Sequence, residues 1–334
     1  MSRPADHPPV PDARIGVLLI NLGTPDAPNA AAVRRYLAEF LSDPRVVEIP
    51  RIAWKPILHG IILRTRPRRS AEAYSQVWTN EGSPLAVIAR RQRNALRERM
   101  ARVKVDYAMR YGNPGIAAAA GRMVEAGCTR ILAAPLYPQY CAATTATAND
   151  AVFAALAAMR SQPALRTLPP YYDDPLYIEA LRANLERQLA ALDFEPERLL
   201  LSFHGMPQRT LDLGDPYHCH CRKTARLVGE ALQREVDVAF QSRFGRAKWL
   251  EPATDAVLTD YPRKGIKRIA VAAPGFSADC LETLEELGIR GRESFLAAGG
   301  KRFALLECLN DSVEGITMLD ALLSRELEGW LAPA

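Results

Sequence analysis

The stretch RIAVAAPGFSADCLETLEELG, at residues 268–288, contains the passage from strand to loop to helix that predicts the fold. It begins with a short apolar run that has the length and the residue types of a buried strand, and Pro274 and Gly275 end that run. The loop that follows brings Asp279 and Cys280 to the end of the strand. The pattern therefore predicts a parallel sheet with polar loops at the carboxyl ends of its strands.

The helix predicted from LETLEEL carries three carboxylates next to that loop. Glu282 and Glu286 are four positions apart, so we expect them on one face of the helix. We expect Glu285 to lie in solvent, outside that face. Asp279 precedes the helix and is placed to cap its first turn. Asp279 and Glu286 are also candidates for a conduit of protons or metal ions. Acidic groups are favoured in the first turn of a helix anyway, so their presence there fits either role.

A second apolar run, LLLSFHGMP at residues 199–207, ends in His204. Ligands of open parallel sheets bind beyond the carboxyl ends of the strands, so we expect His204 and the carboxylates in one crevice. Imidazole titrates near neutrality, and imidazole and carboxylate both bind first-row metal ions. His204 and Glu282 are therefore the predicted proton acceptor and metal ligand, in either order.

The two halves of the chain repeat one plan. Three pairs of segments correspond: NLGTP at 21–25 with FHGMP at 203–207, VDYAMRYG at 105–112 with VDVAFQSRFG at 236–245, and RILAAPLYPQYC at 130–141 with RIAVAAPGFSADC at 268–280. Such self-similarity predicts an α/β protein of two similar Rossmann-like lobes, each a parallel sheet flanked by helices, with a cleft between them. In this register Leu22 takes the place of His204, and Ala143 that of Glu282, so one wall of the cleft is apolar and the other is chemically active.

The repeat also predicts the domain boundaries. We expect an N-terminal lobe over residues 14–160 and a C-terminal lobe over residues 161–312. Residues 1–13, which contain four prolines, are the predicted flexible tail. Residues 313–334 are the predicted C-terminal helix, packing back on the protein.

The first lobe contains an insertion. Gly23 and Gly205 are 182 positions apart, whereas Val105 and Val236 are 131 apart, so about fifty extra residues lie between the first two strands of the first lobe. Residues 49–70 fall inside this insertion and are largely apolar, which predicts a lip over the cleft. We name its candidate lip residues as Trp54, Ile57, Ile61, Arg64 and Arg66. Apolar surface beside a basic cluster also fits peripheral contact with an anionic membrane.

Composition restricts the classes of function. The chain has 334 residues, of which 48% are hydrophobic and 24% charged, with a net charge of +5, and these values are ordinary for a globular protein. No long Lys/Arg block interleaves with aromatic residues, so no nucleic-acid partner is expected. The longest uncharged run, at 131–149, contains two prolines and cannot span a membrane. We expect a cytoplasmic protein whose lip can contact the inner membrane peripherally. We expect the six scattered cysteines to be thiols.

The motifs in these segments resemble the ferrochelatase family. They are NLGTPDAP, GSPL, RYGNP, LYPQY, SFHGMP, GDPY, FQSRFG, KW and GFSADCLETLEE, in this order over roughly residues 15–312. The family inserts ferrous iron into a porphyrin, with release of two protons, in the last step of haem biosynthesis. The resemblance implies a lyase of the bacterial protoporphyrin type with a class II chelatase-like fold, whose partners are protoporphyrin IX and ferrous iron.

The resemblance also implies roles for particular residues. His204 and Glu282 match the essential pair of the family, with the division between proton acceptor and metal ligand left open. Five residues match positions that bind the porphyrin: Leu22, Arg110, Tyr111, Tyr137 and Trp249. Leu22 favours protoporphyrin over coproporphyrin, and Arg64 and Arg66 are candidates for contact with the propionates. Cys280 stands where the family more often has His.

Some ferrochelatases hold an iron–sulfur cluster, and the run His218–Cys219–His220–Cys221 is the most metal-like in this chain. Such a cluster usually needs four thiolates, and Cys219 and Cys221 would diverge by about 200° on a helix. We therefore expect no iron–sulfur cluster and no required cofactor, with ferrous iron as substrate. Two alternatives stay open: a chelatase that loads cobalt or nickel into another tetrapyrrole, and a non-catalytic porphyrin- or haem-binding protein.

Overall fold

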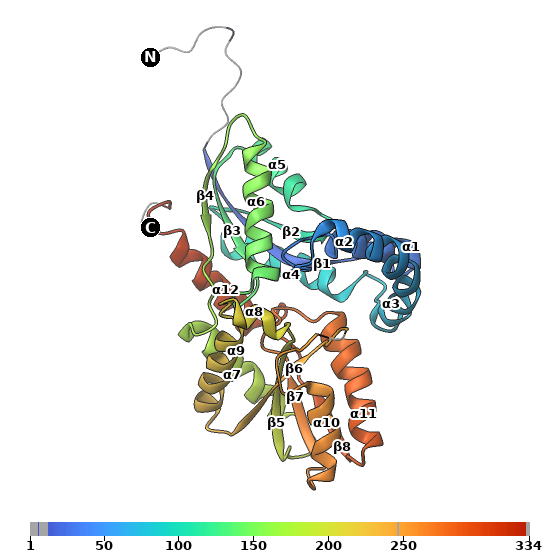
Figure 1. Cartoon of the computed structure of the whole chain (residues 1–334). Coiled ribbons are helices and arrows are strands. Elements are labelled where there is room, and N and C mark those ends of the chain that lie inside the picture. Colours follow the sequence, from blue (N-terminus) through green and yellow to red (C-terminus); the bar gives the residue numbers. More distant parts are fainter. Residues whose placement is uncertain (1–5, 7–12, 246, 332–334) are drawn as a thin grey trace.

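The computed structural model describes residue 6, residues 13–245 and residues 247–331. The predicted tail at 1–13 lies outside the described residues except for Asp6 and Ala13, and so do the last three residues of the predicted C-terminal helix. Figure 1 shows two lobes, one above the other, each built around a parallel sheet with helices on its faces.

The first sheet has the strand order β2-β1-β3-β4. Its strands are β1 (Arg14–Thr24), β2 (Lys104–Gly112), β3 (Cys128–Pro135) and β4 (Ala164–Thr167). All neighbouring pairs are parallel. The centre of β1, from Val17 to Ile20, is at most 2% exposed, because helices cover both faces of the sheet.

The second sheet repeats this arrangement with the order β6-β5-β7-β8. Its strands are β5 (Arg198–His204), β6 (Val236–Gln241), β7 (Arg268–Ala272) and β8 (Arg302–Leu305). The two orders correspond strand by strand, and a π-helix follows both β3 and β7, namely η2 (Ala142–Ala146) and η3 (Glu282–Gly291). The predicted fold class and the internal repeat are confirmed.

Helices fill the connections between the strands. Those of the first lobe outside the insertion are α1 (Ala30–Phe40), α4 (Pro84–Arg99), α5 (Ile116–Glu125) and α6 (Thr147–Ala157). Those of the second lobe are α7 (Pro175–Ala190), α8 (Gln208–Asp212), α9 (Tyr217–Leu232), α10 (Thr254–Arg263) and α11 (Arg292–Ala297). One apolar core cluster contains residues of both lobes, from Val17 to Leu327, so the lobes share a buried interface.

The boundary between the lobes differs from the one we predicted. β4, at Ala164–Thr167, pairs with β3, so the first sheet continues past residue 160. The short strand was missed because ALRT has little apolar periodicity and is recognisable only by its pairing. The boundary therefore moves from residue 160 to the connection after Thr167.

The C-terminal helix α12 spans Val313–Glu326 and packs against α7 and α4. It ends at Glu326, earlier than predicted, and the chain then turns back towards β4. Arg166 of β4 donates a hydrogen bond to the Glu326 carbonyl at 2.6 Å, and its guanidinium lies 4.3 Å from the centre of the Trp330 ring. The end of the described chain thus contacts the first lobe. Figure 1 shows the red C-terminal end of the ribbon beside the green strand β4.

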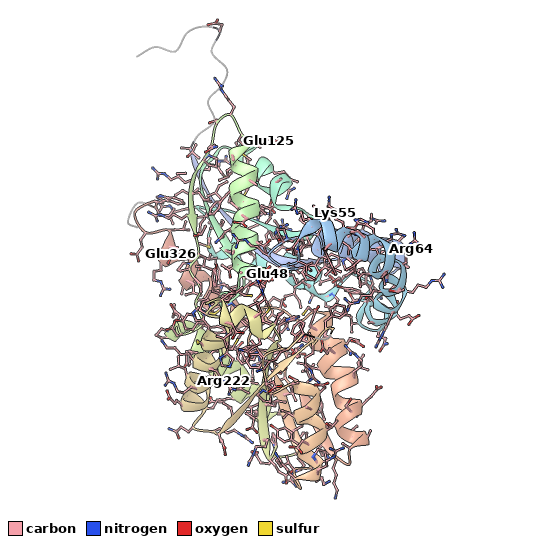
Figure 2. All side chains as sticks on the ribbon, in the orientation of Figure 1. Glu48, Lys55, Arg64, Glu125, Arg222 and Glu326 are labelled. Atoms are coloured by element: carbon pink, nitrogen blue, oxygen red, sulfur yellow. The ribbon has the colours of Figure 1, made fainter. Side chains whose placement is uncertain are left out.

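The insertion forms one long helical segment made of α2 (Arg51–Ile57), η1 (Leu58–Ile62) and α3 (Leu63–Val77). It therefore extends past residue 70. We call residues 51–77 the lip segment. Leu58 and Leu63 are buried in it, whereas Ile52 is 92% exposed and Ile61 58% exposed. Figure 2 shows Lys55 and Arg64 along this segment. No helix in the described parts of the chain is long and apolar enough to cross a bilayer.

Candidate active site

His204 is the last residue of β5, as predicted, and is half-buried. Its Nδ1 lies 2.7 Å from the backbone oxygen of Gly205. A carbonyl oxygen can only accept, so Nδ1 carries the hydrogen in this bond, and a neutral ring then has its lone pair on Nε2. His204 is thus held by its own turn in the tautomer that leaves Nε2 able to accept a proton or bind a metal ion.

Gly205 allows the chain to turn tightly after His204. A Cβ atom on Gly205 would lie 2.4 Å from the Gln241 backbone oxygen and 3.3 Å from the Trp249 ring, so any larger residue would displace both. The close approach is reinforced by a hydrogen bond of 2.7 Å from the Gly205 amide to the Gln241 oxygen. Trp249 therefore packs directly against the turn that orients His204.

Glu282 is the first residue of η3, a π-helix where we predicted an α-helix. Its backbone oxygen accepts a hydrogen bond of 2.8 Å from the side-chain amide of Gln241. Gln241 is the register partner of His204 on the neighbouring strand β6. The structure thus brings His204 and Glu282 to one edge of the second sheet and connects both to Gln241. π-Helical turns are frequent at functional sites.

The charge of the Glu282 carboxylate acts on three neighbouring side chains. Burial raises the pKa of the Cys280 thiol well above its usual value, and Glu282, which hydrogen-bonds to that thiol, raises it further. Burial likewise raises the pKa of Tyr36 and of Tyr74, with a further contribution from the charge of Glu282. Tyr36 is on α1 and Tyr74 on α3, and α3 packs against η3, so the first lobe comes close to the start of η3.

Asp279 anchors the loop before η3 instead of capping the helix. Its carboxylate accepts hydrogen bonds from the Thr283 hydroxyl at 2.7 Å, from the Asn310 amide at 2.6 Å and from the Cys308 backbone amide at 3.3 Å. The expected cap is wrong, because the N-cap residue of η3 is Leu281 and Asp279 turns inward, 4% exposed. A carboxylate with three protein donors has little capacity left to bind a metal ion.

The remaining acidic residues of η3 differ in their contacts. Glu286 is half-buried and accepts hydrogen bonds from the Ser242 backbone amide at 2.8 Å and the Ser242 hydroxyl at 2.5 Å. Glu285, which we expected in solvent, is 6% exposed and pairs with Arg290 at 2.8 Å. That expectation is wrong because η3 has π-helical geometry and packs against the lip segment. Glu282 and Glu286 remain the accessible carboxylates of this turn.

No group of three His, Cys, Asp or Glu side chains is arranged to hold a metal ion in residues 13–245 and 247–331. The two lobes meet at the loops that carry these residues: the Ser277 hydroxyl lies 3.4 Å from the side-chain oxygen of Asn21 on β1. Arg66 of the lip segment lies 4.3 Å from the centre of the Phe244 ring in the loop after β6. The candidate site is thus bordered by both lobes and by the lip segment.

A family model described as Ferrochelatase matches residues 14–327. The chain belongs to the ferrochelatase family. A ferrochelatase of Rhizobium meliloti is 52% identical over 339 residues, covering 99% of this chain and all of the relative. A ferrochelatase of an Azoarcus species is 52% identical over 325 residues, covering 96% of this chain and 89% of the relative.

Solved structures show a similar fold. The chelatase SirB from Bacillus subtilis, determined with Fe3+, matches with a TM-score of 0.58 at 12% identity, covering 95% of this chain and 97% of that one. The cobalt complex of the sirohydrochlorin chelatase SirB matches with a TM-score of 0.53 at 12% identity and the same coverage. At this identity the likeness concerns the fold alone, and it agrees with the predicted class II chelatase-like architecture.

The predicted porphyrin-binding residues of this ferrochelatase fall into two groups. Leu22 and Tyr137 are half-buried at the ends of β1 and β3, and Trp249 is half-buried beside His204. The Tyr137 hydroxyl is buried and has no hydrogen-bond partner among the described residues. Leu22, Tyr137 and Trp249 stay the predicted apolar surface of the site.

Arg110 and Tyr111 belong to a buried network instead. The guanidinium of Arg110 pairs with Asp43 at 2.5 Å, and the Tyr111 hydroxyl donates to the same carboxylate at 2.9 Å. Tyr111 has no exposed surface, so the expectation that it lines the pocket is corrected. Its ring packs against Phe40 and its hydroxyl bonds to Asp43. Burial raises the pKa of Tyr111 far above its usual value. Arg110 is half-buried, and its positive charge is paired with the carboxylate of Asp43.

The His218–Cys221 run lies in the first turns of α9. Cys219 is exposed and Cys221 is completely buried, so the two sulfur atoms diverge as predicted. The His220 ring stacks on Tyr172 with centroids 3.6 Å apart, and its Nδ1 accepts a hydrogen bond from the Tyr140 amide at 3.2 Å. Burial lowers the pKa of His220. The run serves packing between α9 and its neighbours.

The sequence analysis did not single out Gln241, Asn310 or the two tyrosines near Glu282, which are Tyr36 and Tyr74. Gln241 could have been found from the repeat, because it occupies the place of Arg110 at the end of the second strand of its lobe. Tyr36 and Tyr74 carried no such signal. Their proximity to Glu282 arises from the packing of one lobe against the other, which the repeat does not specify.

Proposed function

We propose that this ferrochelatase inserts ferrous iron into protoporphyrin IX at the interface of the two lobes, using His204 and Glu282. Membership of the ferrochelatase family makes the protein a lyase that supplies iron to a porphyrin, in the final step of haem biosynthesis. The observation that carries the site assignment is the attachment of both residues to Gln241 at one sheet edge. The two alternatives, a chelatase for another tetrapyrrole and a non-catalytic carrier, lose their support with that membership.

His204 accepts protons from the pyrrole nitrogens in this proposal. Metallation removes two protons from the macrocycle, so the site needs a base that titrates near neutral pH. The Nε2 of His204 is free to accept such a proton, because Nδ1 is engaged by the Gly205 oxygen. A ring held in one orientation also loses little entropy when the porphyrin arrives.

Glu282 binds the incoming iron. A carboxylate is a suitable oxygen ligand for ferrous iron, and a site of few protein ligands releases the ion to the four pyrrole nitrogens readily. Glu286 lies one turn further along η3 and serves as the preceding station of the metal path. Asp279 is assigned to anchoring, because its carboxylate already accepts three hydrogen bonds.

Leu22, Tyr137 and Trp249 contact the faces of the macrocycle. Burying a flat apolar ligand against aliphatic and aromatic side chains provides most of the binding free energy at about 25 cal/mol per Å² of apolar area. Arg66, at the inner side of the lip segment, is placed to meet a propionate, and burial lowers its pKa. No resident cofactor is required, and iron enters as substrate.

We further propose that the lip segment touches an anionic membrane surface. Ile52, Ile57 and Ile61 are exposed on it, and four arginines follow between positions 64 and 69. Apolar side chains beside basic ones favour the interface of anionic bilayers. Sedimentation with phosphatidylglycerol vesicles tests this, and binding that is unaffected by Ile52→Ser with Ile61→Ser would contradict it.

An anaerobic assay tests the main proposal. Purified protein is mixed with protoporphyrin IX and ferrous iron, and the conversion of the porphyrin spectrum to that of haem is followed with time. We expect catalytic turnover. A spectral shift that stops at one porphyrin per protein would indicate a carrier, and turnover with cobalt or nickel but not with iron would indicate a different chelatase.

A further inference from the structure

A buried contact between the lobes lies behind the loop that leads to Glu282. Gln92, on α4 of the first lobe, is 1% exposed. Its side-chain nitrogen donates to the backbone oxygen of Asn310 at 2.8 Å and to that of Ser277 at 3.4 Å. Both acceptors belong to the second lobe. The side-chain amide of Gln92 therefore bonds across the interface to two segments of the second lobe. One is the loop before η3, at Ser277, and the other is the segment after β8, at Asn310.

Asn310 transmits this contact to the loop. Its φ of 50° is in the left-handed region, which Asn tolerates better than most residues. Its side-chain oxygen accepts from the Asp279 amide at 2.8 Å, and its side-chain nitrogen donates to the Asp279 carboxylate at 2.6 Å. The Asp279 carboxylate in turn holds Thr283, the second residue of η3. A chain of hydrogen bonds thus runs from Gln92 to the turn that contains Glu282.

The same contact contains two unpaired polar atoms. The side-chain oxygen of Gln92 and the hydroxyl of Tyr171 are buried and have no hydrogen-bond partner among the described residues. Both side chains line one cavity of about 10 Å³ at the lobe interface, together with Ser277 and Asn310. This volume admits the centre of about one water molecule. A buried polar atom without a partner is unfavourable, and one water within reach of both atoms would give each of them a partner.

We propose that Gln92 is a positioning residue for the reaction, and that one buried water joining its side-chain oxygen to the Tyr171 hydroxyl completes its hold on the loop at residues 277–282. The water donates one hydrogen to the Gln92 oxygen and bonds through its second hydrogen or a lone pair to Tyr171. The catalytic part of this inference rests on the proposed function. The water site does not, because it follows from burial and hydrogen bonding alone.

A double-mutant cycle on unfolding tests the water site without any activity assay. Gln92→Leu and Tyr171→Phe alter two side chains that share no direct hydrogen bond, so without the water their effects on the unfolding midpoint add. With the water, Tyr171→Phe lowers the midpoint in the wild type and changes it little in Gln92→Leu. Tyr177→Phe is the control and should add to Gln92→Leu, because Tyr177 lines the same cavity but its hydroxyl already donates to the Pro274 oxygen. Additive effects at Tyr171, or a crystal structure without solvent density between the two atoms, would overturn the water site.

Kinetics test the positioning role. We expect Gln92→Leu to lower kcat about ten-fold, the order of effect of a small misplacement of a catalytic group, and to leave the KM for porphyrin within about two-fold. Tyr171→Phe, the milder change, should lower kcat about two-fold while remaining folded. Gln188→Leu is the control, because Gln188 also donates to a backbone oxygen, that of Glu307, but is only half-buried and outside the lobe interface cavity. Unchanged kcat in Gln92→Leu and Tyr171→Phe, in an enzyme whose wild type turns over, would overturn the positioning role and leave the proposed function intact.

Discussion

The side-chain amide of Gln241 donates a hydrogen bond of 2.8 Å to the backbone oxygen of Glu282. Gln241 also accepts from the Ser202 hydroxyl at 2.8 Å and is 2% exposed, so its side chain has one available orientation. Because its backbone pairs with the end of β5 at His204, one residue fixes the relation between the two halves of the site. The separation of His204 and Glu282 is thus set by strand register and one side-chain amide.

Replacing this amide should weaken catalysis without unfolding the protein. Gln241→Glu keeps the oxygen that accepts from Ser202 and removes the hydrogens donated to Glu282, so we expect kcat to fall at least ten-fold and the unfolding free energy to fall by about 1–3 kcal/mol, the usual cost of an unmade buried hydrogen bond. Steady-state kinetics and denaturant unfolding measure the two effects. A variant with wild-type kcat would show that Glu282 does not depend on Gln241.

The lip segment should control porphyrin access rather than the chemistry. Ile57 and Ile61 are 40% and 58% exposed, so replacing both by Ser should change stability by less than about 0.5 kcal/mol. Losing about 1 kcal/mol of apolar contact should raise the KM for porphyrin about five-fold at unchanged kcat.

The matched control for the lip variant is Val313→Ser with Leu213→Ser, at positions 74% and 64% exposed elsewhere on the surface. Trp54 is left intact, because its indole nitrogen donates to the Leu41 oxygen at 2.6 Å and anchors the segment. An unfolded lip variant would mean that the segment is part of the core, and an unchanged KM would mean that it does not contact the porphyrin.

Stability should decline in mild acid through His220. Burial lowers its pKa below the ordinary value of 6.5, and the nearby Asp173 and Asp215 only partly oppose this. The unfolded chain then binds the proton more tightly, so the unfolding free energy falls as pH drops below about 6.5 and levels off below the folded-state pKa. We expect His220→Gln to flatten this slope, whereas His59→Gln, on the exposed lip segment, should not. Parallel slopes in all three proteins would contradict this.

The cysteines of α9 should be dispensable for activity. Cys219 is exposed and Cys221 lies in the core shared by the lobes, so we expect Cys219→Ser with Cys221→Ala to keep kcat within about two-fold while losing about 1–2 kcal/mol of stability. Analysis of iron and acid-labile sulfide in the purified wild type provides the second check. Stoichiometric sulfide would refute the absence of a cluster.

The sequence was sufficient for the six longer strands, the repeat and the position of His204 and the η3 carboxylates at one sheet edge, because these depend on local apolar runs and on the direction of parallel strands. It missed the short strands β4 and β8. It failed at Glu285, since an α-helical period places residues five apart on different faces, about 140° from each other, whereas η3 brings Glu285 and Arg290 into an ion pair. It also failed at Tyr111, whose burial depends on Asp43, 68 positions away. Contacts of this kind are decided by packing between elements.

In the proposed reaction His204 and Glu282 carry out metallation, while other residues bind the porphyrin. The most direct measurement compares single-turnover haem formation, under anaerobic conditions, in the wild type, His204→Ala and Glu282→Gln, with porphyrin affinity measured in the same samples by fluorescence. We predict that both variants lose at least a thousand-fold in rate and keep a porphyrin Kd within about three-fold, because apolar contacts supply most of the affinity. A near-normal rate in either variant would contradict the assignment of the active site.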